Sequence, residues 1–261
     1  MRKGVAVLMY HRIGVGPLAG REVGEDAYAV APEVFREQLE LLASRGCSVV
    51  MTAELAARSR VPAERGVVLT FDDGNHSDWS VALPALRQRG WTATSFVTPA
   101  FIGRPGYMTW PEVRELHQAG WCVGAHGLDH TPLATLPEAE LRRHLREARR
   151  LLEAELAAPV ETLSLPNGSG GPRVLAAAVD AGYRVVFGSV PKLHRPGAAG
   201  PVPRLAVRRG DALGALGAWI EQRPAALRRA LWRHHALGLL RSSIGPGLYQ
   251  RARRAWAGSL P

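Results

Sequence analysis

Two adjacent carboxylates follow an apolar run and could share one chemical task. Asp72 and Asp73 come directly after the run 69–71 and are followed by Gly74. Two carboxylates this close repel each other when both are ionised, and the repulsion is relieved if one binds a cation while the other stays a base. Neighbours on a strand point to opposite faces, but at a strand end both side chains can turn toward the mouth of a barrel. A solvated Asp-Asp-Gly turn explains this segment equally well on its own.

Two histidines four residues apart could bind a metal ion. His126 and His130 follow another β-rich run, at residues 122–125. Side chains with this spacing project the same way on a helical turn, and imidazole is the commonest neutral nitrogen ligand. Together with one aspartate they would form a two-histidine, one-carboxylate set that leaves metal positions open for water and substrate.

Two further polar segments also follow β-rich runs. Pro166, Asn167 and Gly168 follow one of them. Turn chemistry alone explains these three residues, and their functional use would be to aim a backbone N–H at a developing oxyanion. His11 follows the first β-rich run, where a structural partner inside the fold is the plainer interpretation. Each of these groups stands where a strand is expected to stop, and strand ends meet at one rim in a (β/α) barrel.

The elements that must position these residues are short β-rich runs alternating with longer helical patterns. Strands are expected at residues 5–10, 48–51, 67–71, 93–97, 122–125, 161–164 and 183–187. Helices are expected at residues 32–44, 52–58, 78–89, 110–118, 137–156 and 172–181. Several helices close on a glycine that is soon followed by a strand, which is the rhythm of repeated βα units around a parallel sheet. We therefore expect an α/β fold, a distorted (β/α) barrel.

The composition fits one large α/β domain. The chain has 261 residues, of which 46% are hydrophobic and 21% charged, enough to bury a full core. This balance excludes a disordered chain, a disulfide scaffold and a collagen-like repeat. The two cysteines, Cys47 and Cys122, form no C-x-x-C pattern, so no zinc knuckle is expected. We expect the barrel domain to occupy residues 1–210.

Residues 211–261 differ from the rest of the chain and are expected to form a basic helical extension. The formal net charge is +10, and most of it comes from eight arginines in residues 222–261, a stretch without Asp or Glu. Residues 219–256 also hold four aromatic residues, are interrupted at 245–247, and are expected to form two helices. The extension suits an anionic membrane surface or a diphosphate-linked lipid carrier. Helices that pack on the barrel and leave their arginines in water are an equal alternative.

The sequence gives no sign of a signal peptide or a membrane span. Arg2 and Lys3 resemble the basic n-region of a signal peptide, but the apolar run after them stops at His11. No stretch approaches the length needed to cross a bilayer. We expect a cytoplasmic protein that contacts the inner face of the membrane through residues 222–261. No nucleic-acid partner is expected, because the basic charge comes without a recognised binding motif.

In these segments the sequence resembles the polysaccharide deacetylases that share the NodB homology domain, carbohydrate esterase family 4. Residues 70–74 repeat the family's first motif without a change, and residues 126–130 match its second motif, H-x-x-x-H. The resemblance runs from about residue 5 to about residue 207. It implies a distorted barrel of the NodB type. It also implies a metal-dependent hydrolase that removes the N-acetyl group from a polysaccharide or from a lipid-linked or nucleotide-linked sugar.

The resemblance further implies a role for each motif residue. Asp72 would be the catalytic base. Asp73, His126 and His130 would hold a divalent metal, which is usually Zn²⁺ in this family. A formyl group on a lipid-linked formamido sugar is an alternative substrate, because the same metal site would serve both reactions. Loss of any of these four residues would have indicated an inactive glycan-binding protein, and all four are present.

The third motif departs from the commonest family pattern. Pro166, Asn167 and Gly168 stand where the family often has Pro-Tyr-Gly, so the N–H of Asn167 would face the oxyanion and the tyrosine is missing. Many members carry an arginine just before this motif that orients the base, and Ser164 stands in its place. Arg204 could substitute for it, and a surface arginine is an equally good interpretation of that residue.

Two histidines compete for the role of general acid. Most family members carry this histidine in a Leu-x-His motif near the end of the domain. A subgroup that resembles the poly-N-acetylglucosamine deacetylases has it in an N-terminal Tyr-His segment. Tyr10-His11 looks like the second version, so His11 is the expected general acid, and His194 in a Gly/Pro-rich loop is its rival.

Overall fold

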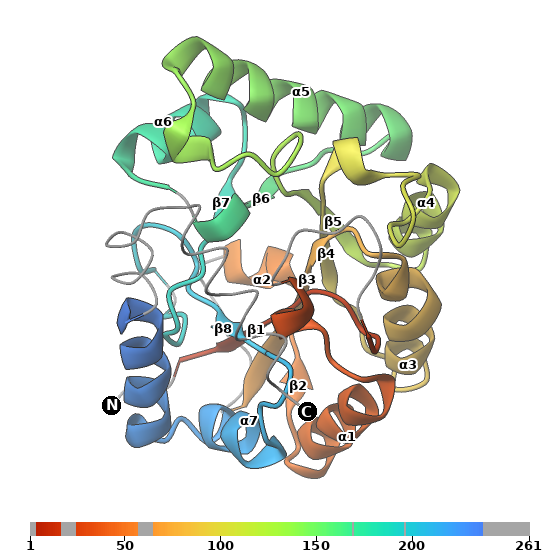
Figure 1. The fold of residues 1–261 in the computed structure, drawn as a ribbon, viewed down its shortest axis with the longest axis vertical. Helices are drawn as coiled ribbons and strands as arrows, with labels where there is room; N and C mark the ends of the chain where they lie inside the picture. The colour runs from red at the N-terminus through yellow and green to blue at the C-terminus, as the bar shows by residue number, and fades with distance from the viewer. Residues whose placement is uncertain (1–3, 17–24, 57–64, 169, 196, 237–261) are drawn as a thin grey trace.

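The computed structural model describes residues 4–16, 25–56, 65–168, 170–195 and 197–236 (Figure 1). Its strands are β1 (Ala6–Tyr10), β2 (Ser48–Val49), β3 (Gly66–Asp73), β4 (Thr94–Val97), β5 (Cys122–Ala125), β6 (Thr162–Ser164), β7 (Val185–Phe187) and β8 (Leu205–Ala206). Its labelled α-helices are α1 (Pro32–Ser44), α2 (Thr52–Ala56), α3 (Leu83–Arg87), α4 (Trp110–Gln118), α5 (Glu138–Leu156), α6 (Pro172–Asp180) and α7 (Leu213–Ile220). Shorter helical turns are η1 (Glu25–Tyr28), the π-helical η2 (Asp78–Ala82), η3 (Pro99–Phe101), η4 (Leu133–Thr135) and η5 (Pro166–Gly168).

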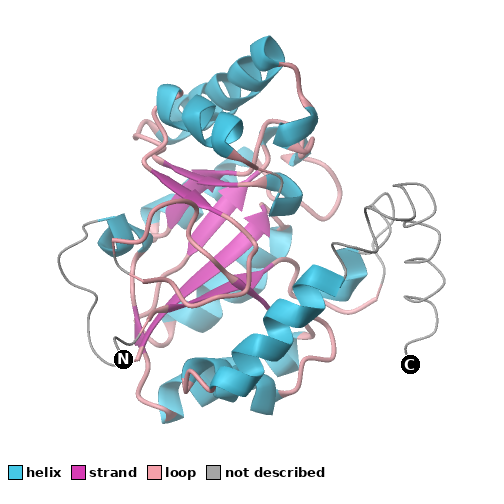
Figure 2. Cartoon of the chain, turned by 90° about the vertical axis from the view of Figure 1, so that its left-hand side faces the viewer, coloured by secondary structure: helices cyan, strands magenta, loops and turns pink. Residues whose placement is uncertain are grey.

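Parallel pairing joins the strands into one curled sheet. Their order is β7-β6-β5-β4-β3-β1-β8, with β2 paired to β3, and all these pairings are parallel. An isolated bridge links Phe187 of β7 to Val202, just before β8, so the two ends of the sheet approach each other. Helices surround the strands, with α5 and α6 at one end and α1 and α7 at the other (Figures 1 and 2). The expected α/β fold with a distorted, barrel-like parallel sheet is confirmed.

The central strands β1 and β3 determine at which end of the sheet the site lies. Every residue of β1 and β3 is buried, as expected for parallel strands covered on both faces. Tyr10, the last residue of β1, pairs with Phe71 of β3. The residues that come next, His11 and Asp72, therefore lie at the same end of the sheet.

Local sequence signals set several helix boundaries. At the start of α4, the N–H of Thr109 donates to Glu112 Oε2 at 2.7 Å, as in a capping box. A left-handed glycine follows four of the helices: Gly46 (φ 63°), Gly90 (φ 66°), Gly120 (φ 89°) and Gly182 (φ 91°). Glycine adopts this conformation without a Cβ clash, so the chain can turn at once toward the next strand.

The helix expected over residues 78–89 has two parts instead of one. A π-helical turn covers Asp78–Ala82, and α3 begins at Leu83. Pro84 has no N–H to donate to the preceding turn, so a continuous α-helical ladder cannot pass through this point.

The C-terminal extension begins inside the core. Leu216, Trp219 and Ile220 of α7 are buried in the same apolar cluster as the barrel residues. Residues 224–236 form a second helix, after a turn in which Gln222 is left-handed with a φ of 58°. The expected helix starting at Trp219 is therefore wrong, because that turn separates Trp219 from the helix. The second expected helix of the extension, beyond residue 247, lies outside the described residues.

Within the described ranges, no helix has both the length and the apolar character of a membrane span.

Candidate metal and catalytic site

Asp73, His126 and His130 come together at the carboxyl ends of the strands. Nε2 of His126 lies 3.4 Å from Asp73 Oδ1, and Nε2 of His130 lies 3.6 Å from the same oxygen. One candidate ligand atom from each residue lies within 4.8 Å of the other two. Asp73 Oδ1 is buried and has no hydrogen-bond partner among the described residues. A buried carboxylate oxygen that faces two imidazoles fits a divalent ion, which would satisfy it.

A backbone contact orients the ring of His126. Its Nδ1 lies 2.9 Å from the carbonyl oxygen of Ser164, so Nδ1 carries the proton and Nε2 presents its lone pair toward Asp73. Burial lowers the pKa of His126 to about 4. The ring is therefore neutral at pH 7, which is the form that binds a metal ion.

The segment 126–130 is a loop and not the helical turn that we expected. Gly127 and His130 have φ values of 71° and 67°, which interrupt a helical path. A Cβ on Gly127 would lie 3.0 Å from Pro166 Cγ, so this loop packs closely on the third motif. The position of both histidines after the end of β5, and not a helical repeat, brings them to Asp73.

Several residues at the site have a left-handed backbone conformation. Five described non-glycine residues have a positive φ, and three of them are Asp73 (81°), His130 (67°) and Asn167 (55°). Such conformations cost roughly 1–3 kcal/mol each and persist only where the surrounding structure enforces them. The left-handed backbone at Asp73 ends the alternation of side chains between the two faces of β3. Consequently the carboxylates of Asp72 and Asp73 lie 3.9 Å and 3.4 Å from the same atom, His126 Nε2.

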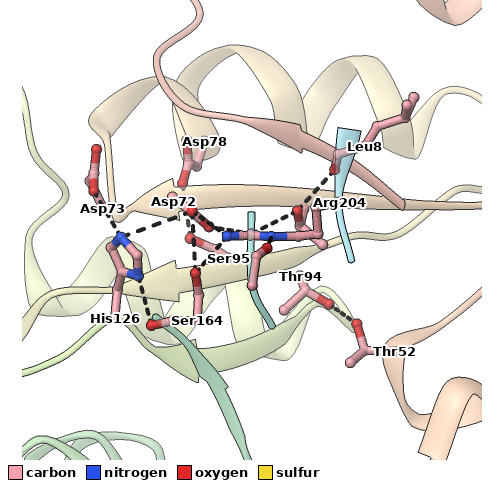
Figure 3. A network of polar contacts seen from close by, with 12 residues as sticks. Leu8, Thr52, Asp72, Asp73, Asp78, Thr94, Ser95, His126, Ser164 and Arg204 are labelled. Atoms are coloured by element: carbon pink, nitrogen blue, oxygen red, sulfur yellow. Dashed lines mark hydrogen bonds and ion pairs between the residues drawn. The ribbon is translucent and has the colours of Figure 1, made fainter. Parts of the chain in front are cut away.

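Asp72 is paired with an arginine inside the barrel. Nη1 and Nη2 of Arg204 donate to Asp72 Oδ1 and Oδ2, each over 2.7 Å (Figure 3). Asp72 is 2% exposed and Arg204 is 1% exposed. Burial alone would raise the pKa of Asp72, but the charge of Arg204 and its hydrogen bonds to the carboxylate outweigh burial and hold this pKa well below its usual range. Asp72 is therefore an ionised carboxylate at neutral pH.

Further contacts hold Arg204 in place. Its Nε donates to Gly188 O at 2.9 Å, and its Nη2 donates to Ser164 Oγ at 2.7 Å. The guanidinium carbon lies 5.5 Å and 5.9 Å from the ring centroids of Phe96 and Phe187. The interpretation of Arg204 as a surface residue is wrong, because these contacts enclose it.

The two candidate general acids lie at opposite ends of β1. His11 directly follows β1, where burial lowers its pKa and the charges of Asp73 and Asp72 act to raise it. His194 exchanges backbone hydrogen bonds with Val5, just before β1 begins. The extended chain between Val5 and His11 is about 20 Å long. The structure therefore brings His11, and not His194, close to the metal-binding residues.

The third motif forms a tight turn at the same rim. Pro166 is buried, Asn167 is exposed, and the N–H of Gly168 donates to Leu165 O at 2.9 Å. Since Pro166 also packs on Gly127, this turn lies directly beside the histidine loop.

Two contacts at the site were missed by the sequence analysis. The hydroxyl of Ser164 lies 3.2 Å from Asp72 Oδ2, although the sequence marked Ser164 only as a missing arginine. The ring of Tyr28 stacks on His11 with 4.6 Å between the ring centroids. Tyr28 comes from a separate segment, and no spacing rule connects it to a strand end.

Comparisons with known proteins agree with this geometry. Residues 59–186 match the protein family described as Polysaccharide deacetylase. The chain is 26% identical over 224 residues to YxkH of Bacillus subtilis (strain 168), which is named as a polysaccharide deacetylase; the match covers 82% of this chain and 75% of YxkH.

Two solved structures share the fold over most of the chain. IcaB from Ammonifex degensii matches with a TM-score of 0.74 and 28% identity, covering 84% of this chain and 98% of IcaB. The deacetylase PplD of Streptococcus pyogenes, solved in complex with acetate, matches with a TM-score of 0.72 and 20% identity, covering 81% of this chain and 95% of PplD. The likeness to PplD shows a common fold alone.

The matched family region contains Asp72 and the three residues whose arrangement fits a divalent ion. Residues 59–186 are similar to the polysaccharide deacetylase family, and Asp73, His126 and His130 in this region form the metal-binding set of a hydrolase that acts on N-acetylated sugars.

Proposed function

We propose that the protein hydrolyses the N-acetyl group of an N-acetylated sugar to a free amine and acetate, with Asp72 as the base and His11 as the general acid. One observation carries this proposal. Asp72 is ionised and paired with Arg204, while the neighbouring Asp73 faces two imidazoles. The two environments suit two different roles, a proton acceptor and a cation ligand.

Asp73, His126 and His130 would hold the metal ion. Two imidazole nitrogens and one carboxylate oxygen form a donor set that suits Zn²⁺. When bound, such an ion polarises an amide carbonyl and lowers the pKa of water.

Asp72 would accept the proton of the attacking water. Its ionised state at neutral pH is the form that a base needs. Because Arg204 binds both carboxylate oxygens, the carboxylate is kept in one orientation before the substrate arrives.

His11 would protonate the departing nitrogen, since an amide nitrogen leaves poorly unless it is protonated. The backbone N–H of Asn167 would donate to the oxyanion, and one such donor is typically worth about 3 kcal/mol. Pro166 and Gly168 shape the turn that carries this donor.

An acetate-release assay on a soluble oligomer of N-acetylglucosamine tests the proposal. We expect acetate and free amine in equal amounts, loss of both after chelation, and recovery with Zn²⁺. An N-formylated oligomer serves as the second arm, and faster formate than acetate release would reassign the protein to the deformylase alternative. A metal-loaded protein that releases neither product would contradict hydrolysis altogether.

We also propose that the helical extension contacts an anionic membrane surface as a peripheral element at the inner face. Trp232 on the helix 224–236 is 73% exposed, and Arg228 is also exposed. A cavity of about 630 Å³ lies between α7 and this helix. Most of its lining residues are small, and Arg229 and Arg233 also line it. Guanidinium groups would pair with lipid phosphates while the indole enters the interface.

Co-sedimentation with lipid vesicles tests this contact. We expect binding to phosphatidylglycerol vesicles at low salt, weaker binding at high salt, and none to phosphatidylcholine vesicles. Trp232→Ala and Arg228→Gln should each weaken it. Wild-type protein that stays in the supernatant with phosphatidylglycerol at low salt would refute the membrane contact.

A further inference from the structure

His11 forms part of a stack of three side chains at the end of β1. The ring centroids of His11 and Tyr28 lie 4.6 Å apart, with 25° between the ring planes. The guanidinium carbon of Arg208 lies over the Tyr28 ring, 5.1 Å from its centroid. The Tyr28 ring therefore contacts both the imidazole of His11 and the guanidinium of Arg208.

In the part of the chain that the structure describes, His11 lacks the hydrogen bond that usually orients a catalytic imidazole. In many hydrolases a carboxylate or a carbonyl accepts the proton of Nδ1 and fixes the angle of the ring. Nδ1 of His11 is buried and has no hydrogen-bond partner among the described residues. The aromatic contact with Tyr28 therefore defines the plane in which this ring lies.

The segment that carries the tyrosine is tied to both neighbouring strands. The N–H of Val30 donates to Arg12 O at 2.9 Å, just after β1. The N–H of Arg209 donates to Ala27 O at 2.9 Å, just after β8. These two hydrogen bonds fix the backbone on either side of Tyr28, so its ring has a defined position against His11.

We propose that Tyr28 is a positioning residue that holds the His11 ring so that its proton reaches the departing amine nitrogen. This inference rests on the role proposed above for His11. As the bond between the carbonyl carbon and nitrogen breaks, the nitrogen takes the proton from His11, and the products are acetate and a neutral amine. Tyr28 neither gives nor takes a proton, and Arg208 helps to hold the phenol in place through a cation–π contact.

The leaving group distinguishes positioning from a structural role. An amine must be protonated to leave, whereas an aryl oxide leaves without a proton. A misplaced His11 should therefore slow hydrolysis of the N-acetylated sugar and spare hydrolysis of 4-methylumbelliferyl acetate at the same site. Damage to the fold would slow both reactions.

For Tyr28→Ala we expect kcat on the N-acetylglucosamine oligomer to fall at least about tenfold, with KM within about twofold. Hydrolysis of the aryl acetate should stay within about twofold of wild type. Tyr28→Phe keeps the stacked ring and is the matched control, so it should resemble wild type on both substrates. Tyr28→Leu keeps the apolar bulk without a π face, and it serves as the second variant if Tyr28→Ala unfolds.

His11→Gln should reproduce the same pattern, and Tyr28→Ala should add little in that background because both act through one group. Equal losses on the two substrates, unchanged amide turnover in Tyr28→Ala, or a full additional loss on top of His11→Gln would overturn the positioning role. Failure of the proposed function looks different. In that case the wild-type protein releases no acetate from the sugar, or His11→Gln keeps full amide turnover.

Discussion

Arg204 binds both carboxylate oxygens of Asp72 although the two residues lie 132 positions apart in the chain. The two parallel N–H···O bonds of 2.7 Å use the forked shape of the guanidinium. Because both side chains are buried, this pair sets the charge state of Asp72 and its orientation. Ser164 stands where the resemblance led us to expect an arginine, and its hydroxyl donates to Asp72 Oδ2 and accepts from Arg204 Nη2.

Removal of the guanidinium should affect stability and catalysis together. In Arg204→Met the carboxylate of Asp72 stays buried without a partner, so we expect a loss of about 3–5 kcal/mol in the free energy of unfolding, measured in urea. The pKa of Asp72 should rise, and the acidic limb of the pH–rate profile should move to higher pH.

Arg204→Lys is the matched variant for that experiment. Lysine keeps the positive charge but cannot make two parallel hydrogen bonds, so its losses should lie between those of wild type and Arg204→Met. A stable Arg204→Met protein with a wild-type pH–rate profile would show that the pair is not needed.

Ser164→Ala separates the two contacts of Ser164. The hydroxyl serves Asp72 and Arg204, whereas the backbone carbonyl receives the hydrogen bond of His126. We expect a loss of about 1 kcal/mol in stability and a few-fold slower turnover, with unchanged zinc affinity in equilibrium titration. A large loss of zinc affinity would mean that the hydroxyl also supports the metal ligands.

The choice between His11 and His194 can be tested directly. His11→Gln should lower kcat on an N-acetylated oligomer by about 10²–10⁴-fold. His194→Gln should leave kcat unchanged, because His194 lies at the other end of β1. The reverse result would assign the role of general acid to His194. Thermal unfolding of both variants is the control for folding.

The sequence alone was enough to predict the site residues that follow strand ends, because the carboxyl ends of parallel strands meet at one rim of the barrel. Asp72, Asp73, His126 and His11 were all found in this way. The alternation of apolar runs and helices likewise predicted strands at the positions of β1 to β7.

What the sequence could not supply were contacts between distant segments. The pairing of Arg204 with Asp72 depends on β8, a strand of two residues that leaves no periodic signal. Tyr28 reaches His11 through a short helical turn, and α7 was missed because an all-apolar helix carries no amphipathic stripe. The interpretation of residues 126–130 as a helical turn was wrong because Gly127 and His130 have a left-handed backbone conformation.

Stability of the metal-free protein should depend on pH through His126. Burial lowers its pKa from 6.5 to about 4, so the unfolded chain binds more protons at this residue between those values. The free energy of unfolding should therefore fall as the pH drops from about 6.5 to about 4, by about 3 kcal/mol from this group. Urea unfolding in the presence of EDTA at several pH values measures the slope. The slope should be shallower in His126→Asn, and an equal slope in that variant would rule out His126 as its source.

The most direct test combines metal analysis with acetate release on two neighbouring variants. Asp73→Ala should lose both the bound metal and turnover, because it removes one of three ligands. Asp72→Asn should keep the metal and lose turnover, because it removes only the base. If Asp73→Ala retains a full equivalent of metal, or if Asp72→Asn turns over like wild type, the division of roles between the two carboxylates is wrong.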